Sequence, residues 1–215
     1  MSLRAVVVGA SGLVGKQLLQ LLLADRRYSS VLVLVRGSLE IKHPRLKELL
    51  VEFDSLDQPA LPKLDHAFCC LGTTIKRAGS RLAFRKVDHD YVVAFARSAR
   101  RSGARHFFLV SAMGANSQSG VFYNRIKGEV ETAVQALGYP GVSILRPSML
   151  TGNRTEYRSG ERIALTLLAP VSRLIPAKYR PVSDRAVAST LIHAAVHEQA
   201  GVEIIESDRI QELGN

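Results

Sequence analysis

The sequence predicts an α/β fold in which helices cover both faces of a doubly wound parallel sheet. Apolar runs of strand length alternate with segments of helical periodicity along most of the chain, an order typical of βαβ units. The apolar runs are continuous, as expected of parallel strands buried on both sides. The 215 residues suit one sizeable core, so we expect a single domain over 1–215.

The first strand and the first helix are the clearest pair. Residues 3–9 (LRAVVVG) are apolar and rich in valine and end at a glycine, which predicts a buried strand. A helical pattern follows over Leu13–Ala24. The apolar side of this helix is formed by Leu18, Leu19, Leu22 and Leu23.

Later segments repeat the alternation. Further strands are expected at 31–36, 49–53, 66–71, 105–110, 142–147 and 202–205. Helices are expected at around 44–49, 88–101, 120–137, 161–169 and 184–198. Gly103 stops the second of these helices, and Gly138 with Pro140 ends the third, because glycine and proline terminate helices. No internal repeat or linker divides the chain.

The chain is strongly basic, since 29 Lys and Arg against 19 Asp and Glu give a formal net charge of +10. Such a balance favours anionic partners such as nucleic acids, membrane surfaces or phosphorylated ligands. The basic residues are spread along the chain and are densest between Lys76 and Arg105. That region has few aromatic residues for base stacking, so we interpret it as a solvated basic face and regard nucleic-acid binding as a minor alternative.

Two adjacent cysteines, Cys69 and Cys70, lie in an apolar run. Neighbouring side chains on a strand point to opposite faces, so no disulfide is expected between them, and no metal-ligand spacing surrounds them. No apolar run approaches the roughly 20 residues that span a bilayer, and no signal-peptide cleavage site follows the first strand. We therefore expect a cytoplasmic protein without a metal site or membrane segment; its oligomeric state stays open.

A glycine-rich turn joins the first strand to the first helix, with the sequence Gly9-Ala10-Ser11-Gly12-Leu13-Val14-Gly15. Glycines allow a tight turn, close approach of a diphosphate and close packing of helix on strand. The helix N-terminus offers free N–H groups and a partial positive charge to phosphates. The spacing is GxxGxxG rather than GxGxxG, but its position between strand and helix is that of a dinucleotide-binding turn. We predict a Rossmann-type fold whose cofactor is held by this turn.

The end of the second strand predicts which dinucleotide binds. A carboxylate there would bind the ribose 2′-hydroxyl and select NAD, whereas an arginine can hold the 2′-phosphate of NADP. This strand ends at Arg36-Gly37-Ser38, with no acid until Glu40. We predict NADP(H), with Arg36 binding the phosphate through charge-assisted hydrogen bonds; the alternative is a solvated arginine.

Tyr123 and Lys127 lie four residues apart on a predicted helix, so their side chains share one face. A free tyrosine has a pKa of about 10, and a neighbouring ammonium makes such a phenol a better proton donor. Ser111 ends the fifth strand, and its hydroxyl can hydrogen-bond a substrate carbonyl. The alternative is a surface tyrosine with a solvated lysine; the upstream serine and the glycine turn favour a catalytic set.

Six blocks along the chain resemble the atypical short-chain dehydrogenase/reductases, namely GASGLVG, CLGTT, VDHDYV, HFFLVSAMGA, FYNRIKGE and LRPSMLTGNR. More narrowly, they are similar to small NAD(P)-binding oxidoreductase-like proteins related to the human Tat-interacting oxidoreductase and to bacterial nucleoside-diphosphate-sugar epimerase-like proteins. The resemblance covers about residues 4–162. It implies a Rossmann fold, NADP(H) binding and catalytic roles for Ser111, Tyr123 and Lys127, the lysine also binding the cofactor ribose.

The resemblance implies further cofactor contacts at the ends of three strands. These are Asp54 and Ser55 near the adenine, then Leu71, Gly72, Thr73 and Thr74 beside the ribose and nicotinamide, and Pro147 and Ser148 near the nicotinamide amide.

The sequence departs from the family in two respects. Many active members carry an asparagine on the helix before the fifth strand; residues 84–101 contain none, and Asp88, His89 or Asp90 takes that neighbourhood. A proton relay through asparagine is therefore in doubt. The chain also leaves only about residues 150–200 for a small C-terminal substrate cap, which favours a small substrate over a nucleotide sugar.

Together these features predict an NADP(H)-dependent oxidoreductase that transfers hydride to or from a small carbonyl or alcohol substrate. The alternative is a non-catalytic NADP(H)-binding redox sensor or regulatory protein. The intact Ser-Tyr-Lys set favours the enzyme, because a sensor needs no proton donor.

Overall fold

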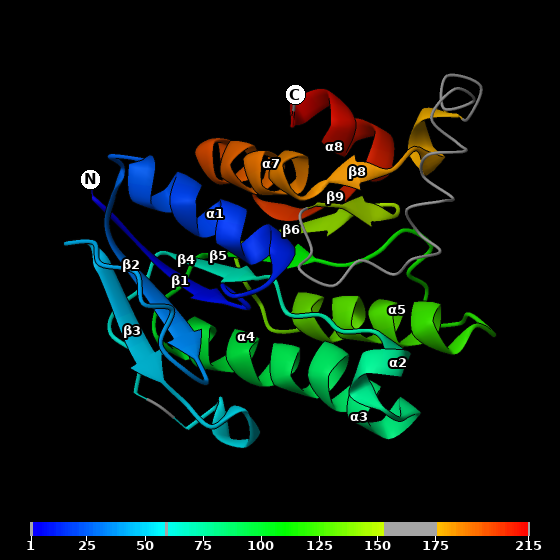
Figure 1. Cartoon of the computed structure of the whole chain (residues 1–215), viewed down its shortest axis with the longest axis horizontal. Coiled ribbons are helices and arrows are strands. Elements are labelled where there is room, and N and C mark those ends of the chain that lie inside the picture. Colours follow the sequence, from blue (N-terminus) through cyan, green and yellow to red (C-terminus); the bar gives the residue numbers. More distant parts are fainter. Residues whose placement is uncertain (1, 59, 153–175, 215) are drawn as a thin grey trace.

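The computed structural model describes residues 2–58, 60–152 and 176–214. In this part of the chain, seven parallel strands form one sheet in the order β3-β2-β1-β4-β5-β6-β9 (Figure 1). The strands are β1 (Leu3–Val8), β2 (Tyr28–Val35), β3 (Leu46–Leu50), β4 (His66–Cys69), β5 (His106–Val110), β6 (Gly141–Arg146) and β9 (Gly201–Glu206). The predicted doubly wound parallel sheet is confirmed.

The order of the strands reverses between β1 and β4. The chain runs from β1 outward to β2 and β3, then returns to pair β4 with the other side of β1, where Val8 lies opposite Cys69. Open α/β sheets bind ligands outside the carboxyl ends of the strands at such a switch point. The glycine-rich turn follows β1 directly and therefore lies at this point.

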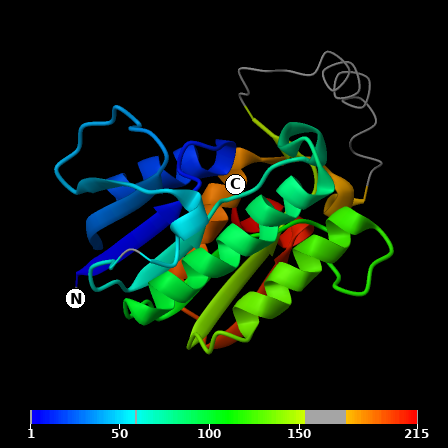
Figure 2. The ribbon, with the colours of Figure 1, turned by 90° about the horizontal axis from the view of Figure 1, so that it is seen from below.

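Helices cover both faces of the sheet, as Figures 1 and 2 show. One face packs against α1 (Leu13–Ala24), α7 (Asp184–His197) and α8 (Ser207–Leu213), and the other against α4 (Tyr91–Arg101) and α5 (Phe122–Gln135). Each face has its own apolar core, because alternate residues of each strand point to opposite faces. On β5, Phe108 joins the α1 side and Phe107 the α4 side.

Short elements lie at the carboxyl edge of the sheet. They are α2 (Ile75–Ala78), α3 (Arg81–Arg85), the π-helical turn η2 (Lys86–Asp90), the 3₁₀ turns η1 (Phe53–Ser55) and η4 (Ala177–Tyr179), and the strand pair β7 (Leu150–Thr151) and β8 (Val182–Ser183). Thr74 and Ser80 cap α2 and α3, each accepting a backbone N–H through its side-chain oxygen. The turn η2 runs directly into α4, so the predicted helix over 88–101 begins with a wider turn.

The predicted helix around 44–49 is wrong. Residues Leu46–Leu50 form β3, which pairs with β2 at the edge of the sheet. The segment LKELL is short and half-buried, and so short an apolar pattern does not distinguish helix from strand. The third strand was therefore expected about three residues too late, at 49–53, where Phe53 already belongs to η1.

Other boundaries differ less. The helix expected from Gly120 begins at Phe122, and the short last strand extends over Gly201–Glu206. The final helix α8 was not predicted. The helix expected at 161–169, and much of the expected cap at 150–200, lie outside the described residues.

Candidate nucleotide-binding and catalytic site

The glycine turn packs too closely for side chains at two of its positions. Gly9 has a φ of +80°, and a Cβ there would lie 2.6 Å from the backbone of Cys70. A Cβ on Gly15 would lie 2.1 Å from the carbonyl oxygen of Gly9. Both approaches are well inside van der Waals contact, so the first helix packs directly on the turn, and the turn packs directly on the residue that follows β4.

The N-terminus of α1 is uncapped by side chains. Gly12 is its N-cap residue, and the first turn holds no acidic residue. The N–H of Gly12 closes the turn onto the carbonyl of Gly9 at 3.0 Å, whereas the first N–H groups of a helix have no partner within it. Ser11 and Gly12 are exposed, Leu13 is half-buried, and Val14 and Gly15 are buried. The exposed backbone fits a diphosphate.

Arg36 follows the end of β2 and is exposed. Its guanidinium lies 5.5 Å from the ring centroid of Phe53, and within the described residues it forms no ion pair. Glu48 on β3 does not pair with Arg36; its carboxylate accepts the backbone N–H of Leu39 at 3.2 Å. The guanidinium of Arg36 is therefore available to bind a phosphate at the end of β2.

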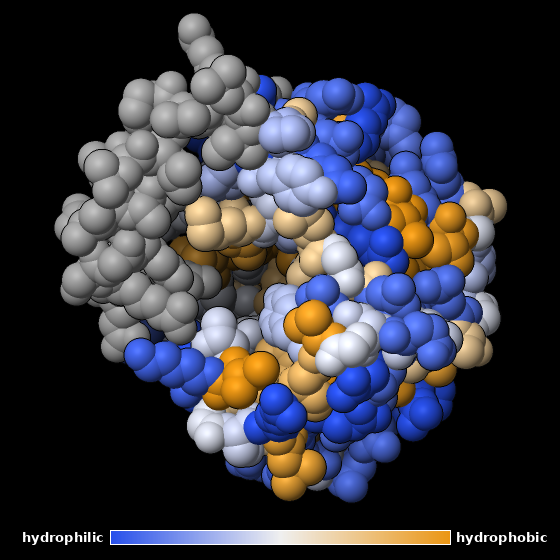
Figure 3. All heavy atoms as spheres, turned by 90° about the vertical axis from the view of Figure 1, so that its right-hand side faces the viewer, coloured by the Kyte–Doolittle hydropathy of each residue, from blue (hydrophilic) through white to orange (hydrophobic). Residues whose placement is uncertain are grey.

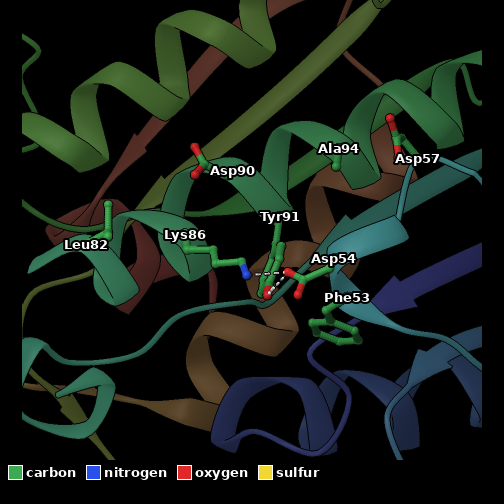
Figure 4. A pocket seen from close by; sticks show the side chains of 8 residues that line it. All are labelled: Phe53, Asp54, Asp57, Leu82, Lys86, Asp90, Tyr91 and Ala94. Atoms are coloured by element: carbon green, nitrogen blue, oxygen red, sulfur yellow. Dashed lines mark hydrogen bonds and ion pairs between the residues drawn. The ribbon is translucent and has the colours of Figure 1, made fainter. Parts of the chain in front are cut away.

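Asp54 lies in a small polar network beside a cavity of about 390 Å³ (Figure 4). Lys86 Nζ lies 2.6 Å from its carboxylate, and the Tyr91 hydroxyl donates to it at 2.6 Å. Hydrogen bonding to Lys86 and then to Tyr91 holds the pKa of Asp54 below its ordinary value. The cavity is lined by Phe53, Asp54, Asp57, Leu82, Lys86, Asp90, Tyr91 and Ala94. Ser55, beside Asp54, is half-buried and donates its N–H to Glu52.

Lys127 is buried and pairs with a buried aspartate. Its Nζ lies 2.8 Å from Asp88 Oδ1, and the two side chains are 6% and 0% exposed. Burial lowers the pKa of Lys127, but the charge of Asp88 and hydrogen bonding to it, together with the neighbouring Tyr123 and Cys69, outweigh burial and leave this pKa raised. Asp88 Oδ2 also accepts the backbone N–H of Thr73 at 2.9 Å. The lysine is therefore joined to the loop after β4, where Leu71 is buried and Gly72 faces the ion pair.

Tyr123 lies one helical turn before Lys127 on α5 and is half-buried. Its ring lies 5.4 Å from that of Phe84, a fully buried residue of α3. Its hydroxyl is near enough to the Lys127 ammonium for the two groups to interact electrostatically. The structure thus brings the predicted tyrosine and lysine together.

Ser111 contacts a different part of α5. Its hydroxyl donates to Glu131 Oε1 at 2.5 Å, one turn beyond Lys127. Glu131 is 2% exposed and also pairs with Arg146, whose Nη2 lies 2.6 Å from Oε2. Among the described residues Ser111 makes no hydrogen bond to Tyr123. Glu131 was not singled out from the sequence, although it follows Lys127 at the same spacing of four that separates Tyr123 from Lys127.

The segment after β6 is hydrogen-bonded to three neighbouring segments. Pro147 is buried, and its carbonyl accepts the N–H of Met113 at 2.9 Å. Ser148 donates its N–H to Ser207 Oγ at 3.2 Å and its hydroxyl to the carbonyl of Arg180. These contacts fix the backbone that follows β6, where the nicotinamide amide is expected.

Figure 3 faces the end of the molecule where α5 begins and where β7 and β8 lie, and its surface is hollowed there with apolar side chains beside the hollow. Among the described residues, no helix is long and apolar enough to cross a membrane. The same residues hold no group of three or more His, Cys, Asp or Glu side chains that could bind a metal ion.

A parallel sheet with a glycine turn at its switch point defines a Rossmann-type, dinucleotide-binding fold. The family match and the relatives below support an atypical short-chain dehydrogenase/reductase-like protein. The chain belongs to the NAD(P)H-binding family, which it matches over residues 9–198. It is 34% identical to Protein HTATIP2 of Rattus norvegicus over 213 residues, which covers 97% of this chain and 88% of the relative. It is 35% identical over 159 residues to Protein FMP52, mitochondrial, of Eremothecium gossypii, which covers 74% and 71%.

Solved structures share the fold. WbmH of Bordetella bronchiseptica, in complex with NAD+, superposes with a TM-score of 0.72 at 14% identity, covering 99% of this chain and 79% of that one. A short chain dehydrogenase from Burkholderia cenocepacia, in complex with NADP, gives a TM-score of 0.69 at 17% identity and covers 98% and 90%. At such identities the likeness establishes the fold, and the neighbours include both NAD and NADP complexes.

Proposed function

We propose that the protein is an NADP(H)-dependent oxidoreductase that transfers hydride to or from a small carbonyl or alcohol substrate. The observation that carries the proposal is the pair formed by Tyr123 and Lys127 on successive turns of α5. Lys127 lies beside Gly72, and its partner Asp88 accepts the backbone N–H of Thr73, in the loop that follows β4 at the switch point of the sheet. A proton donor at the cofactor-binding edge is what carbonyl reduction requires.

The residues at this edge fit a dinucleotide. The turn around Gly9 and Gly15 has no room for side chains, and Gly12 leaves the start of α1 open to a diphosphate. Arg36, exposed and without a carboxylate partner in the described part of the chain, would hold a 2′-phosphate, which supports NADP(H) over NAD(H). When bound, the nicotinamide supplies the hydride.

Tyr123 donates its hydroxyl proton to the substrate oxygen as the carbonyl carbon is reduced, and the phenolate recovers a proton from solvent. In oxidation of an alcohol the proton moves in the opposite direction. Lys127 binds the cofactor ribose through its ammonium group and stabilises the tyrosinate electrostatically. Ser111 would polarise the substrate carbonyl, which requires its hydroxyl to turn from Glu131 toward the substrate.

The Tyr123→Phe variant tests the proposal. It keeps the aromatic ring against Phe84 but removes the proton donor, so it should bind NADPH with the affinity of the parent protein. We expect a screen of small aldehydes and ketones to find turnover in the parent that falls at least about 10²-fold in the variant. Turnover retained in Tyr123→Phe would exclude Tyr123 as the proton donor.

A non-catalytic NADP(H) sensor is the second candidate, and one observation favours it. The proton of the Ser111 hydroxyl is committed to a buried carboxylate, so the serine is not poised to donate to a substrate. A sensor would bind NADPH and NADP+ with different affinities and would show no turnover with any carbonyl in the screen. Calorimetry with both nucleotides separates it from the enzyme.

A further inference from the structure

We infer that Asp88 is the positioning residue of Lys127: its buried carboxylate holds the ammonium group in place and in its charged form beside the loop that follows β4. The inference deepens the proposed function and rests on it for the role of Lys127. Asp88 lies in the segment where many related enzymes carry an asparagine. Unlike an asparagine amide, its carboxylate can supply a negative charge to the ammonium group of Lys127.

The carboxylate of Asp88 joins three segments of the chain. Oδ1 lies 2.8 Å from Lys127 Nζ on α5, and Oδ2 accepts the backbone N–H of Thr73 at 2.9 Å. Oδ1 makes no hydrogen bond of normal geometry among the described residues, so its contact with the ammonium is an ion pair. One side chain on η2 therefore fixes the lysine relative to the loop that borders the nucleotide.

Asp88 supplies the only negative charge that faces Lys127 from the described elements packed around it. The other titratable groups that interact with the ammonium are Cys69 on β4 and Tyr123 on α5 itself. Burial raises the pKa of Cys69 to about 12, so the thiol is uncharged at neutral pH, and an ordinary tyrosine is uncharged there as well. Without Asp88, the lysine would be a buried cation with no counter-charge, and burial favours the neutral amine.

The neighbouring acid on η2 does not share this task. The side chain of Asp90 is 54% exposed and lies 2.8 Å from the ring of His89. Asp88, two residues earlier, is fully buried. A Cβ placed on Gly72 would lie 3.5 Å from Asp88 Oδ1 and 3.8 Å from Lys127 Nζ, so the ion pair borders the backbone that is proposed to lie beside the ribose. Asp88 and Asp90 thus form a matched pair of test and control.

Lysine side-chain NMR of the nucleotide-free protein tests the inference without any substrate. The Lys127 signal is assigned by its loss in Lys127→Arg, and its titration is followed in the parent, Asp88→Asn and Asp90→Asn. We expect Lys127 to titrate above its ordinary range in the parent and in Asp90→Asn, and roughly one pH unit or more lower in Asp88→Asn. A Lys127 that titrates at the same pH in Asp88→Asn as in the parent would overturn the inference.

A double variant covers the case in which Asp88→Asn does not fold. Asp88→Asn/Lys127→Gln removes both charges, so it should fold if the unpaired ammonium is what unfolds the single variant. A double variant as unfolded as the single one would contradict the inference. NADPH calorimetry on the parent reports separately on the proposed function: absence of nucleotide binding would defeat that function, while the Lys127 titration would still decide the role of Asp88.

Discussion

Ser111 and Glu131 form a buried hydrogen bond of 2.5 Å between β5 and α5. An ionised carboxylate only accepts hydrogen bonds, and the hydroxyl has a single proton to give. Arg146 pairs with the same carboxylate and keeps it in place. The serine must therefore exchange partners before it can polarise a carbonyl.

Replacement of Ser111 shows whether it polarises the substrate or only links β5 to α5. If Ser111 polarises the substrate, Ser111→Ala should lower kcat by about 10²-fold while NADPH binds unchanged, since one donor to a developing oxyanion has about that effect. The control is Ser98→Ala, which truncates a different buried serine that lies on α4; this variant should keep full turnover. Unchanged kcat in Ser111→Ala would leave the serine a purely structural link between β5 and α5.

The glycine turn should tolerate substitution very unevenly. Gly15→Ala should destabilise the fold by about 1–3 kcal/mol and weaken NADPH binding, because its Cβ would meet the Gly9 carbonyl oxygen at 2.1 Å. Gly37→Ala is the control, since no atom lies within 4 Å of the added Cβ, and we expect a change within about 0.5 kcal/mol. Urea unfolding and NADPH titration of both variants check this; equal effects would mean that close packing is not the reason for Gly15.

Arg36 should decide between the two nicotinamide cofactors. Arg36→Ala should weaken NADPH binding by about 10- to 100-fold, the usual effect of losing charge-assisted hydrogen bonds to a phosphate, and leave NADH binding unchanged. Arg97→Ala removes an exposed arginine from α4 and keeps the same net charge as the test variant. Calorimetry with both nucleotides measures the ratio. An equal loss for NADH and NADPH would place Arg36 away from the 2′-phosphate.

The stability of the protein should fall in mild acid because of a buried histidine. Burial lowers the pKa of His106 to about 4, and the ring is held by Ser143 at 2.9 Å. Between pH 6.5 and about 4 the unfolded chain binds a proton that the folded protein excludes, so the free energy of unfolding falls as the pH falls. The loss reaches at most about 3 kcal/mol for this group.

Urea unfolding at pH 7.5 and pH 5.5 measures this loss. His106→Gln should reduce the difference between the two pH values, whereas His43→Gln, which changes a half-buried histidine far from β5 in the sequence, should preserve it. His66, whose pKa is also lowered by burial, is present in all three proteins and contributes in the same direction. An identical pH dependence in His106→Gln and the parent would contradict the assignment.

The central sheet could be predicted from the sequence because each inner strand is a continuous apolar run with both faces covered. The edge strand β3 could not, because LKELL has a single neighbouring strand and little burial to mark it. The pairing of β7 with β8 joins residues about 30 positions apart, and two-residue strands leave no periodicity to read. The seven-residue helix α8 is similarly too short for a clear pattern.

The candidate site follows the same division. Tyr123 and Lys127 could be paired because a helix brings residues four apart onto one face. That Ser111 would meet Glu131 rather than Tyr123 depends on how β5 and α5 are placed against each other, which local patterns do not contain. The choice of Asp88 over His89 and Asp90 depends on the π-helical register of η2.

The register of η2 means that residue identity alone does not preserve the Asp88–Lys127 contact. A π-helical turn accommodates one more residue than the α-helix on either side of it. Deleting one residue between Asp88 and Phe95 would allow a continuous α-helix and rotate Asp88 by about 100° relative to α4, away from Lys127. When homologous chains are aligned, a one-residue gap in this segment would therefore mark proteins that have lost the ion pair, even where the aspartate and the lysine are both conserved.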